Sequence, residues 1–116
     1  NAPKAVGPYS QAIEVNGTLY ISGQIPVNPA DGTVQEEITA AAHQSLKNIG
    51  AILREAGMTY DNVVKTTVLL ADIADFKAVN EVYAEYFTGD KPARACYQAA
   101  ALPLGVKVEI EAIAVR

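Results

Sequence analysis

The chain has 116 residues, half of them apolar, and its 13 acidic and 9 basic residues give a net charge of −4. This length predicts one domain, residues 1–116, with a hydrophobic core. The net negative charge disfavours nucleic acid as a partner, because the negatively charged phosphate backbone repels an acidic protein. No apolar run reaches the roughly 20 residues of a membrane span, and the start lacks the layout of a secretory signal, so we expect a soluble, cytoplasmic protein.

Metal and disulfide chemistry are also disfavoured by composition. Cys96 is the single cysteine and His43 the single histidine. One cysteine forms no internal disulfide, and these two residues do not have the spacing of metal ligands. The sequence therefore predicts no metal site.

The first third of the chain predicts a hairpin followed by a loop. Residues 9–15 and 18–22 are β-prone, and Asn16-Gly17 between them is a strong signal for a two-residue hairpin turn. Residues 23–33 contain two prolines and an Asp-Gly pair, which favour repeated turns. We expect two antiparallel strands and then a surface loop.

The middle of the chain alternates helix and strand. From Glu37 the apolar residues recur every three or four positions until Gly57, which is suited to end the helix. Residues 62–70 are β-branched and predict a strand. A second helix is expected from an Asp75 N-cap to Gly89. Its apolar stripe comprises Phe76, Val79, Tyr83, Tyr86 and Phe87.

Two further strands are predicted within residues 92–103 and 106–115, joined by a connection rich in proline and glycine. The order is ββαβαββ, an α+β fold in which two helices cover one face of a mixed sheet. In the last strand one face is apolar, and the other is a mixture of charged and apolar side chains. Since no chain remains to cover this second face, we expect a homo-oligomer with sites near its interfaces.

Arg94 and Glu109 are the strongest candidates for chemistry. An arginine in a strand expected to be buried needs a partner or a function. Its planar guanidinium is suited to bind a substrate carboxylate through two hydrogen bonds. A half-buried glutamate can have a raised pKa and accept a proton from water. If the two strands pair antiparallel, both groups flank one cavity; a structural Arg–Glu pair fits the same pattern.

Four other residues are weaker candidates. Cys96 shares a strand face with Arg94, but a single thiol without a recognisable triad is more often a packed apolar group. Tyr9 could stack on a planar substrate, and Asn80 could line a pocket or lie on the surface. Gly23 permits a ligand to approach the backbone closely.

Several motifs in order resemble the reactive-intermediate deaminase family, RidA, also called YjgF. The resemblance covers nearly the whole chain, and its most specific part is the last block. The motifs are Gly7-Pro8-Tyr9-Ser10-Gln11, Ser22-Gly23-Gln24-Ile25-Pro26, Val64-Lys65-Thr66-Thr67-Val68, Phe76 with Val79-Asn80 and Tyr83, Pro92-Ala93-Arg94 with Cys96, and Leu102-Pro103 followed by Val108-Glu109-Ile110-Glu111-Ala112-Ile113-Ala114.

This resemblance implies a chorismate-mutase-like fold of the bacillus type, a homotrimer, and clefts between subunits that bind small carboxylates. It implies hydrolysis of 2-iminopropanoate and 2-iminobutanoate to 2-oxo acids and ammonia, without metal or cofactor. Arg94 would bind the carboxylate and Glu109 would hold the attacking water. Tyr9 and Asn80 would contact the substrate, and Gly23 and Cys96 would contribute backbone groups.

Two rival functions stay open at this point. The first is a regulatory or carboxylate-binding protein without turnover, which needs Arg94 but not Glu109. The second is ribonuclease or translation-inhibitor activity, which is attributed to some relatives of the family. The acidic balance and the single histidine argue against the second.

Overall fold

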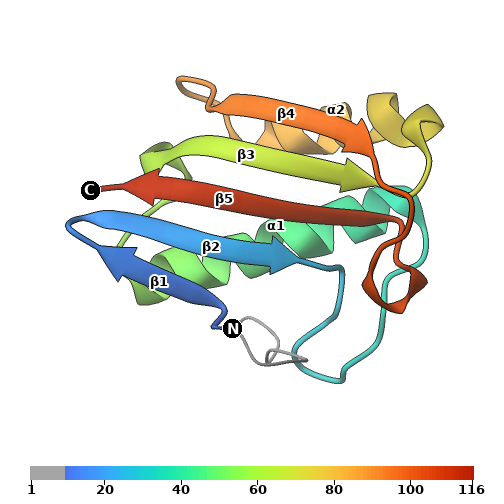
Figure 1. Ribbon diagram of the computed structural model, residues 1–116, viewed down its shortest axis with the longest axis horizontal. Helices are drawn as coiled ribbons and strands as arrows, with labels where there is room; N and C mark the ends of the chain where they lie inside the picture. The colour runs from blue at the N-terminus through green and yellow to red at the C-terminus, as the bar shows by residue number, and fades with distance from the viewer. Residues whose placement is uncertain (1–9) are drawn as a thin grey trace.

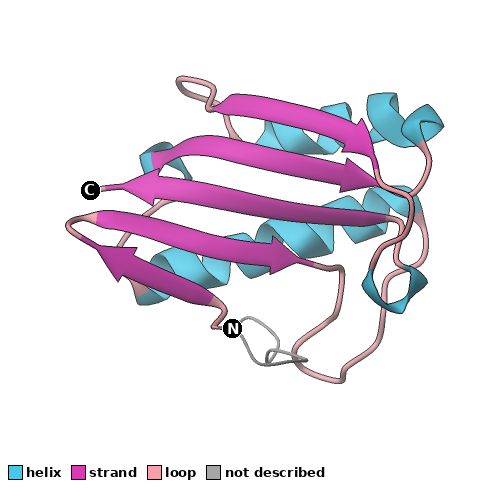
Figure 2. Ribbon diagram, viewed as in Figure 1, coloured by secondary structure: helices cyan, strands magenta, loops and turns pink. Residues whose placement is uncertain are grey.

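The computed structural model describes residues 10–116 and has one five-stranded sheet with two α-helices on one face (Figures 1 and 2). The elements are β1 (Ala12–Val15), β2 (Thr18–Gln24), α1 (Ile38–Glu55), β3 (Val63–Leu70), α2 (Phe76–Tyr86), β4 (Ala93–Gln98) and β5 (Val108–Val115). The strand order is β1-β2-β5-β3-β4, and β3 and β4 form the parallel pair in an otherwise antiparallel sheet. The predicted α+β class and the ββαβαββ order are confirmed.

The local turn chemistry explains the first hairpin. Asn16 and Gly17 have φ values of 50° and 82°, the left-handed conformation that both central residues of a type I′ turn require. Strand β1 pairs antiparallel with β2 in the register Val15 to Thr18. Strand β2 continues through Gly23 and Gln24, which the sequence placed in the following loop.

Capping defines both ends of α1. The side chain of Glu37 accepts hydrogen bonds from the backbone N–H groups of Thr39 and Ala40, and Gly57 follows the helix with φ 75°. For α2, Asp75 occupies the N-cap position but its side chain makes no capping hydrogen bond. Asp72 instead caps the preceding 3-10 turn by accepting from the N–H of Ala74.

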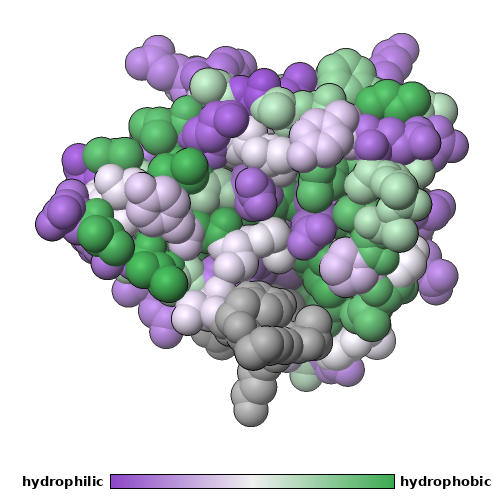
Figure 3. Space-filling view, viewed as in Figure 1, coloured by the Kyte–Doolittle hydropathy of each residue, from purple (hydrophilic) through white to green (hydrophobic). Residues whose placement is uncertain are grey.

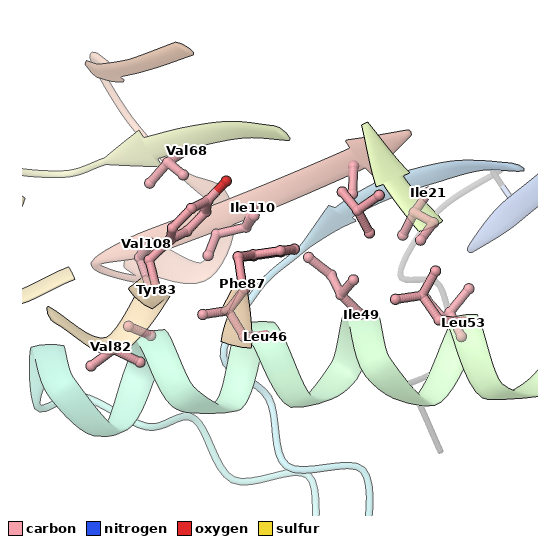
Figure 4. Packing of buried hydrophobic residues seen from close by; sticks show 14 of the residues in the cluster. Ile21, Leu46, Ile49, Leu53, Val68, Val82, Tyr83, Phe87, Val108 and Ile110 are labelled. Carbon is pink, nitrogen blue, oxygen red and sulfur yellow. The ribbon is translucent and has the colours of Figure 1, made fainter. Parts of the chain in front are cut away.

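The core lies between the helices and the sheet (Figure 4). Leu46, Ile49 and Leu53 of α1 point toward the sheet, where they meet the inward side chains of β5. As predicted, these inward residues of β5 are fully apolar: Val108, Ile110, Ala112 and Ala114. Alternation along the strand leaves Glu109 and Glu111 on the opposite face.

One polar atom of this core has no partner. Ser45 on α1 is completely buried, and among residues 10–116 its hydroxyl oxygen is the one buried side-chain polar atom that makes no hydrogen bond. We expect Ser45→Ala to raise the free energy of unfolding by about 1 kcal/mol, because it removes an unsatisfied group and improves helix propensity. Urea denaturation measures this. A loss of stability would show that the hydroxyl is satisfied.

The position of β4 differs from the sequence prediction. Strand β4 does not pair with β5; it pairs in parallel with β3 at the edge of the sheet, and β5 lies between β2 and β3. The cause is the β3-α2-β4 crossover, which returns the chain beside β3 in the same direction. The connection to β5 then passes the end of β3, where Ala99 N–H donates to Leu70 O and Ala71 N–H to Lys107 O.

The face of the sheet away from the helices, here called the open face, has nothing covering its apolar side chains within residues 10–116. Ile13, Tyr20 and Tyr97 are 57%, 50% and 53% exposed, and the first two lie beside the charged Lys65 and Glu111. Figure 3 views this side of the molecule and shows apolar and charged residues side by side. A hollow of about 630 Å³ lies over Tyr20, Lys65 and Glu111.

Neither helix in residues 10–116 has the length and apolar character needed to cross a membrane.

Candidate functional site

Arg94 lies on the edge strand β4 and is exposed, so the predicted buried position is wrong. Its register partner on β3 is Thr66, which places the Arg94 side chain on the helix-covered side of the sheet. There its Nη1 donates a hydrogen bond to Oδ1 of Asn80, at 2.5 Å. Its Cζ lies 4.9 Å from the ring centre of Tyr83 and 5.4 Å from that of Phe76.

These three neighbours of Arg94 come from one face of α2. Positions 76, 80 and 83 are separated by four and three residues, the spacing that stacks side chains on one side of a helix. With Arg94 they form what we call the Arg94 group: Phe76, Asn80, Tyr83 and Arg94. The apolar stripe predicted that Phe76 and Tyr83 pack in the core. Tyr83 is buried, but Phe76 is 38% exposed beside the guanidinium. The spacing of positions 76, 80 and 83 was the sequence signal that could have grouped these side chains on one side of the helix.

No carboxylate neutralises Arg94 within the described part of the chain. The ion pairs found in residues 10–116 join His43 to Glu85 and Glu14 to Arg116. Within residues 10–116 the guanidinium makes one hydrogen bond, to Asn80, and its remaining N–H groups have no partner there. The structural Arg94–Glu109 pair is therefore absent from this chain, and the guanidinium is oriented but not paired.

Cys96 lies two residues beyond Arg94 on the same side of the sheet and packs partly buried against the core. Burial raises the pKa of its thiol, and the positive charge of Arg94 opposes that shift only in part. A thiol with a raised pKa stays protonated near neutrality and is a poor nucleophile. This environment fits a packing and backbone role.

Glu109 lies on the open face and is half-buried. Burial is the main cause that raises the pKa of its carboxyl, and the nearby charge of Glu111 adds to it. Gly23 of β2 lies directly against this carboxylate, because a Cβ atom at Gly23 would overlap Oε2 and Cδ of Glu109. We call Gly23 and Glu109 the Glu109 group. The missing side chain of Gly23 makes the space that the carboxylate occupies.

The two groups do not meet within one chain. Strand β3 separates β4 from β5, and the registers Thr66 to Arg94 and Leu69 to Glu109 put the two side chains on opposite faces of the sheet. The expectation that both flank one cavity of a single chain is therefore wrong. Tyr9, the remaining predicted substrate contact, lies outside the described residues.

Among residues 10–116 no three His, Cys, Asp or Glu side chains gather in a way that could hold a metal ion. The chemistry available at these positions is that of a cation, a carboxylate, an amide and aromatic rings.

Comparison with known proteins agrees with the motifs. The family model described as Endoribonuclease L-PSP matches residues 1–116. The chain belongs to the RidA/YjgF family. Within this family, the 2-iminobutanoate/2-iminopropanoate deaminase of Mus musculus is 59% identical over 116 residues, covering 99% of this chain and 86% of the relative.

Solved structures of RidA/YjgF relatives have the same fold. The crystal structure of the YjgF gene product from E. coli is 48% identical with a TM-score of 0.97, and the match covers 100% of this chain and 94% of that one. The structure of E. coli TdcF with bound serine is 43% identical with a TM-score of 0.96, covering 99% and 93%. These matches confirm the family that the sequence motifs indicated.

Proposed function

We propose that this protein hydrolyses 2-imino acids such as 2-iminopropanoate and 2-iminobutanoate to 2-oxo acids and ammonia. The observation that carries the proposal is the state of Arg94, whose guanidinium is held by Asn80 and two aromatic rings but has no carboxylate partner within residues 10–116. An oriented, unpaired guanidinium is suited to bind a carboxylate substrate. Relatives named as deaminases of these imino acids, 57–60% identical to this chain, support the choice of substrate.

The reaction needs few groups. Arg94 binds the carboxylate of the substrate and so fixes the position of the adjacent C=N carbon. Glu109, whose raised pKa makes it a better proton acceptor, takes a proton from the attacking water as its oxygen bonds to that carbon. That proton passes to the imine nitrogen, which gives a tetrahedral intermediate with a hydroxyl and an amine on one carbon. Glu109 then moves the hydroxyl proton to the amine, the C–N bond breaks as the C=O bond forms, and ammonia leaves with the 2-oxo acid.

The site is built by two subunits of a homotrimer with a chorismate-mutase-like fold. One chain presents the Arg94 group and the Glu109 group on opposite sides of its sheet. A neighbouring chain that covers the apolar open face brings its own Arg94 group to the Glu109 group of the first chain. A relative with bound serine, an amino acid that carries a carboxylate, is consistent with such a site.

Mixing two inactive variants tests the shared site. Arg94→Ala and Glu109→Ala chains with different tags are co-expressed, and oligomers carrying both tags are purified. A serine dehydratase generates 2-aminoacrylate, and semicarbazide traps the imine that the protein fails to hydrolyse. Each variant alone should be inactive, but the purified mixed oligomers should regain roughly one third of the sites, because each mixed trimer contains one intact interface of three.

Activity restored in mixed oligomers supports both the deaminase and the shared site. Mixed oligomers that stay inactive, while the unmodified protein is active, would reject the shared site. An unmodified protein that never suppresses the semicarbazide adduct would reject the deaminase.

The rival functions predict other outcomes. A carboxylate-binding protein without turnover would bind 2-oxobutanoate, and its affinity would not change in the Glu109→Ala variant. A ribonuclease, the activity named by the family model, would cleave RNA in a way that depends on lysine or arginine residues but not on Glu109. In this chain the single histidine is engaged, with Nδ1 of His43 2.7 Å from the hydroxyl of Tyr86.

A further inference from the structure

Three residues beside the proposed carboxylate site form a closed chain of contacts. Thr66 on β3 is the register partner of Arg94 on β4. Its Oγ1 lies 2.7 Å from the hydroxyl of Tyr83 on α2. The ring of Tyr83 returns to the guanidinium, with its centre 4.9 Å from Cζ of Arg94. Each of the three residues therefore contacts the other two, and these contacts connect the sheet, the helix and the guanidinium.

The Thr66–Tyr83 hydrogen bond is deep in the core. Thr66 is completely buried and Tyr83 is 6% exposed, and in Figure 4 the ring of Tyr83 points from its helix toward the sheet. Within residues 10–116 each hydroxyl has the other as its partner. Turning the ring of Tyr83 would leave both hydroxyls unsatisfied in an apolar environment, so the ring has one favoured orientation.

A fixed ring matters because Arg94 is a long side chain on an exposed edge strand. Such a side chain samples many rotamers unless its neighbours restrict it. The Tyr83 ring attracts the guanidinium through its π-face, and Asn80 takes one N–H of Nη1. The other N–H groups are left for a ligand, so the geometry prepares the guanidinium before the substrate arrives.

We propose that Tyr83, held in place by Thr66, is the positioning residue for Arg94 and sets the affinity for the substrate carboxylate. This inference rests on the proposed function, in which Arg94 binds that carboxylate. In this proposal Tyr83 acts through the guanidinium and not on the substrate itself.

The test measures the dissociation constant of 2-oxobutanoate, the reaction product, by NMR titration. Tyr83→Phe keeps the ring but removes the hydroxyl bond, and it should weaken binding about threefold. Tyr83→Leu removes the ring as well and should weaken it about tenfold. The matched control is Tyr86→Phe, one turn on in α2, which loses an equivalent hydrogen bond to His43 and should change the affinity less than twofold.

A double-mutant cycle separates positioning from a general structural effect. In an Arg94→Met background, the residual affinity should change less than twofold when Tyr83→Phe is added. An equal loss in both backgrounds, or no loss from either Tyr83 variant, would overturn the inference. Wild-type affinity in Arg94→Met itself would reject the proposed carboxylate role and this inference with it. Since Tyr83→Phe keeps the packed ring, the test holds even if Tyr83→Leu does not fold.

Discussion

Arg94→Ala should lower kcat/KM for 2-iminobutanoate by about three orders of magnitude, because the substrate carboxylate loses both its charge partner and its orientation. Arg94→Lys should lower it by about two orders, since an ammonium keeps the charge but lacks the planar fork. Neither change should alter the thermal midpoint much, because Arg94 is exposed and makes no ion pair within residues 10–116. The semicarbazide competition assay measures the activity, and light scattering checks the oligomer.

Cys96→Ser is the matched control for the Arg94 variants. It lies two residues away on the same strand, and its thiol has a raised pKa unsuited to a nucleophile. It should retain most of the activity. Normal turnover by Arg94→Ala would remove the carboxylate role, and complete inactivation by Cys96→Ser would point to thiol chemistry.

Gly23→Ala should lower kcat by about two orders of magnitude with little loss of stability. The new methyl group would overlap the carboxylate of Glu109, and this carboxylate must move because the strand backbone of β2 does not. Moving the group that holds the water by about 1 Å is enough for a hundredfold loss. KM should change less, since the carboxylate of the substrate is bound by Arg94.

The control for this substitution is Gly89→Ala, at another glycine without positive φ, where a Cβ atom would meet Asp61 Oδ1 at 3.5 Å, an ordinary contact. It should leave kcat unchanged. Thermal unfolding of both variants separates a local displacement from unfolding. A fully active Gly23→Ala enzyme would mean that the position of Glu109 is not needed for hydrolysis.

Much of the fold was predictable because its signals are local. The left-handed turn at Asn16-Gly17 and the helix end at Gly57 follow from the conformational freedom of these residue types. The alternation of Val108, Glu109, Ile110 and Glu111 correctly separated the core face of β5 from the open face. Asp75 occupies the N-cap position without capping, because it ends the 3-10 turn with φ −83° and ψ 1° and lacks the extended backbone of a capping residue.

The candidate site was only partly predictable. Residue type singled out Arg94 and Glu109, and the structure gives the first an oriented, unpaired guanidinium and the second a raised pKa. The condition set for their meeting in one chain, antiparallel pairing of the last two strands, does not hold, because β3 lies between β4 and β5. Phe76 and Tyr83 were predicted to be core residues because both belong to the apolar stripe of the helix. Such a stripe does not show which of its residues contact an exposed cation from another strand.

The sequence by itself determined the order of the elements, the apolar face of each and the chemical groups available, since these depend on neighbours a few residues apart. Only the tertiary structure decided that β5 inserts between β2 and β3, because strand order results from competition among long-range pairings. The strand registers place Arg94 and Glu109 on opposite faces, and the β3-α2-β4 crossover brings Thr66 and Tyr83 together beneath the guanidinium.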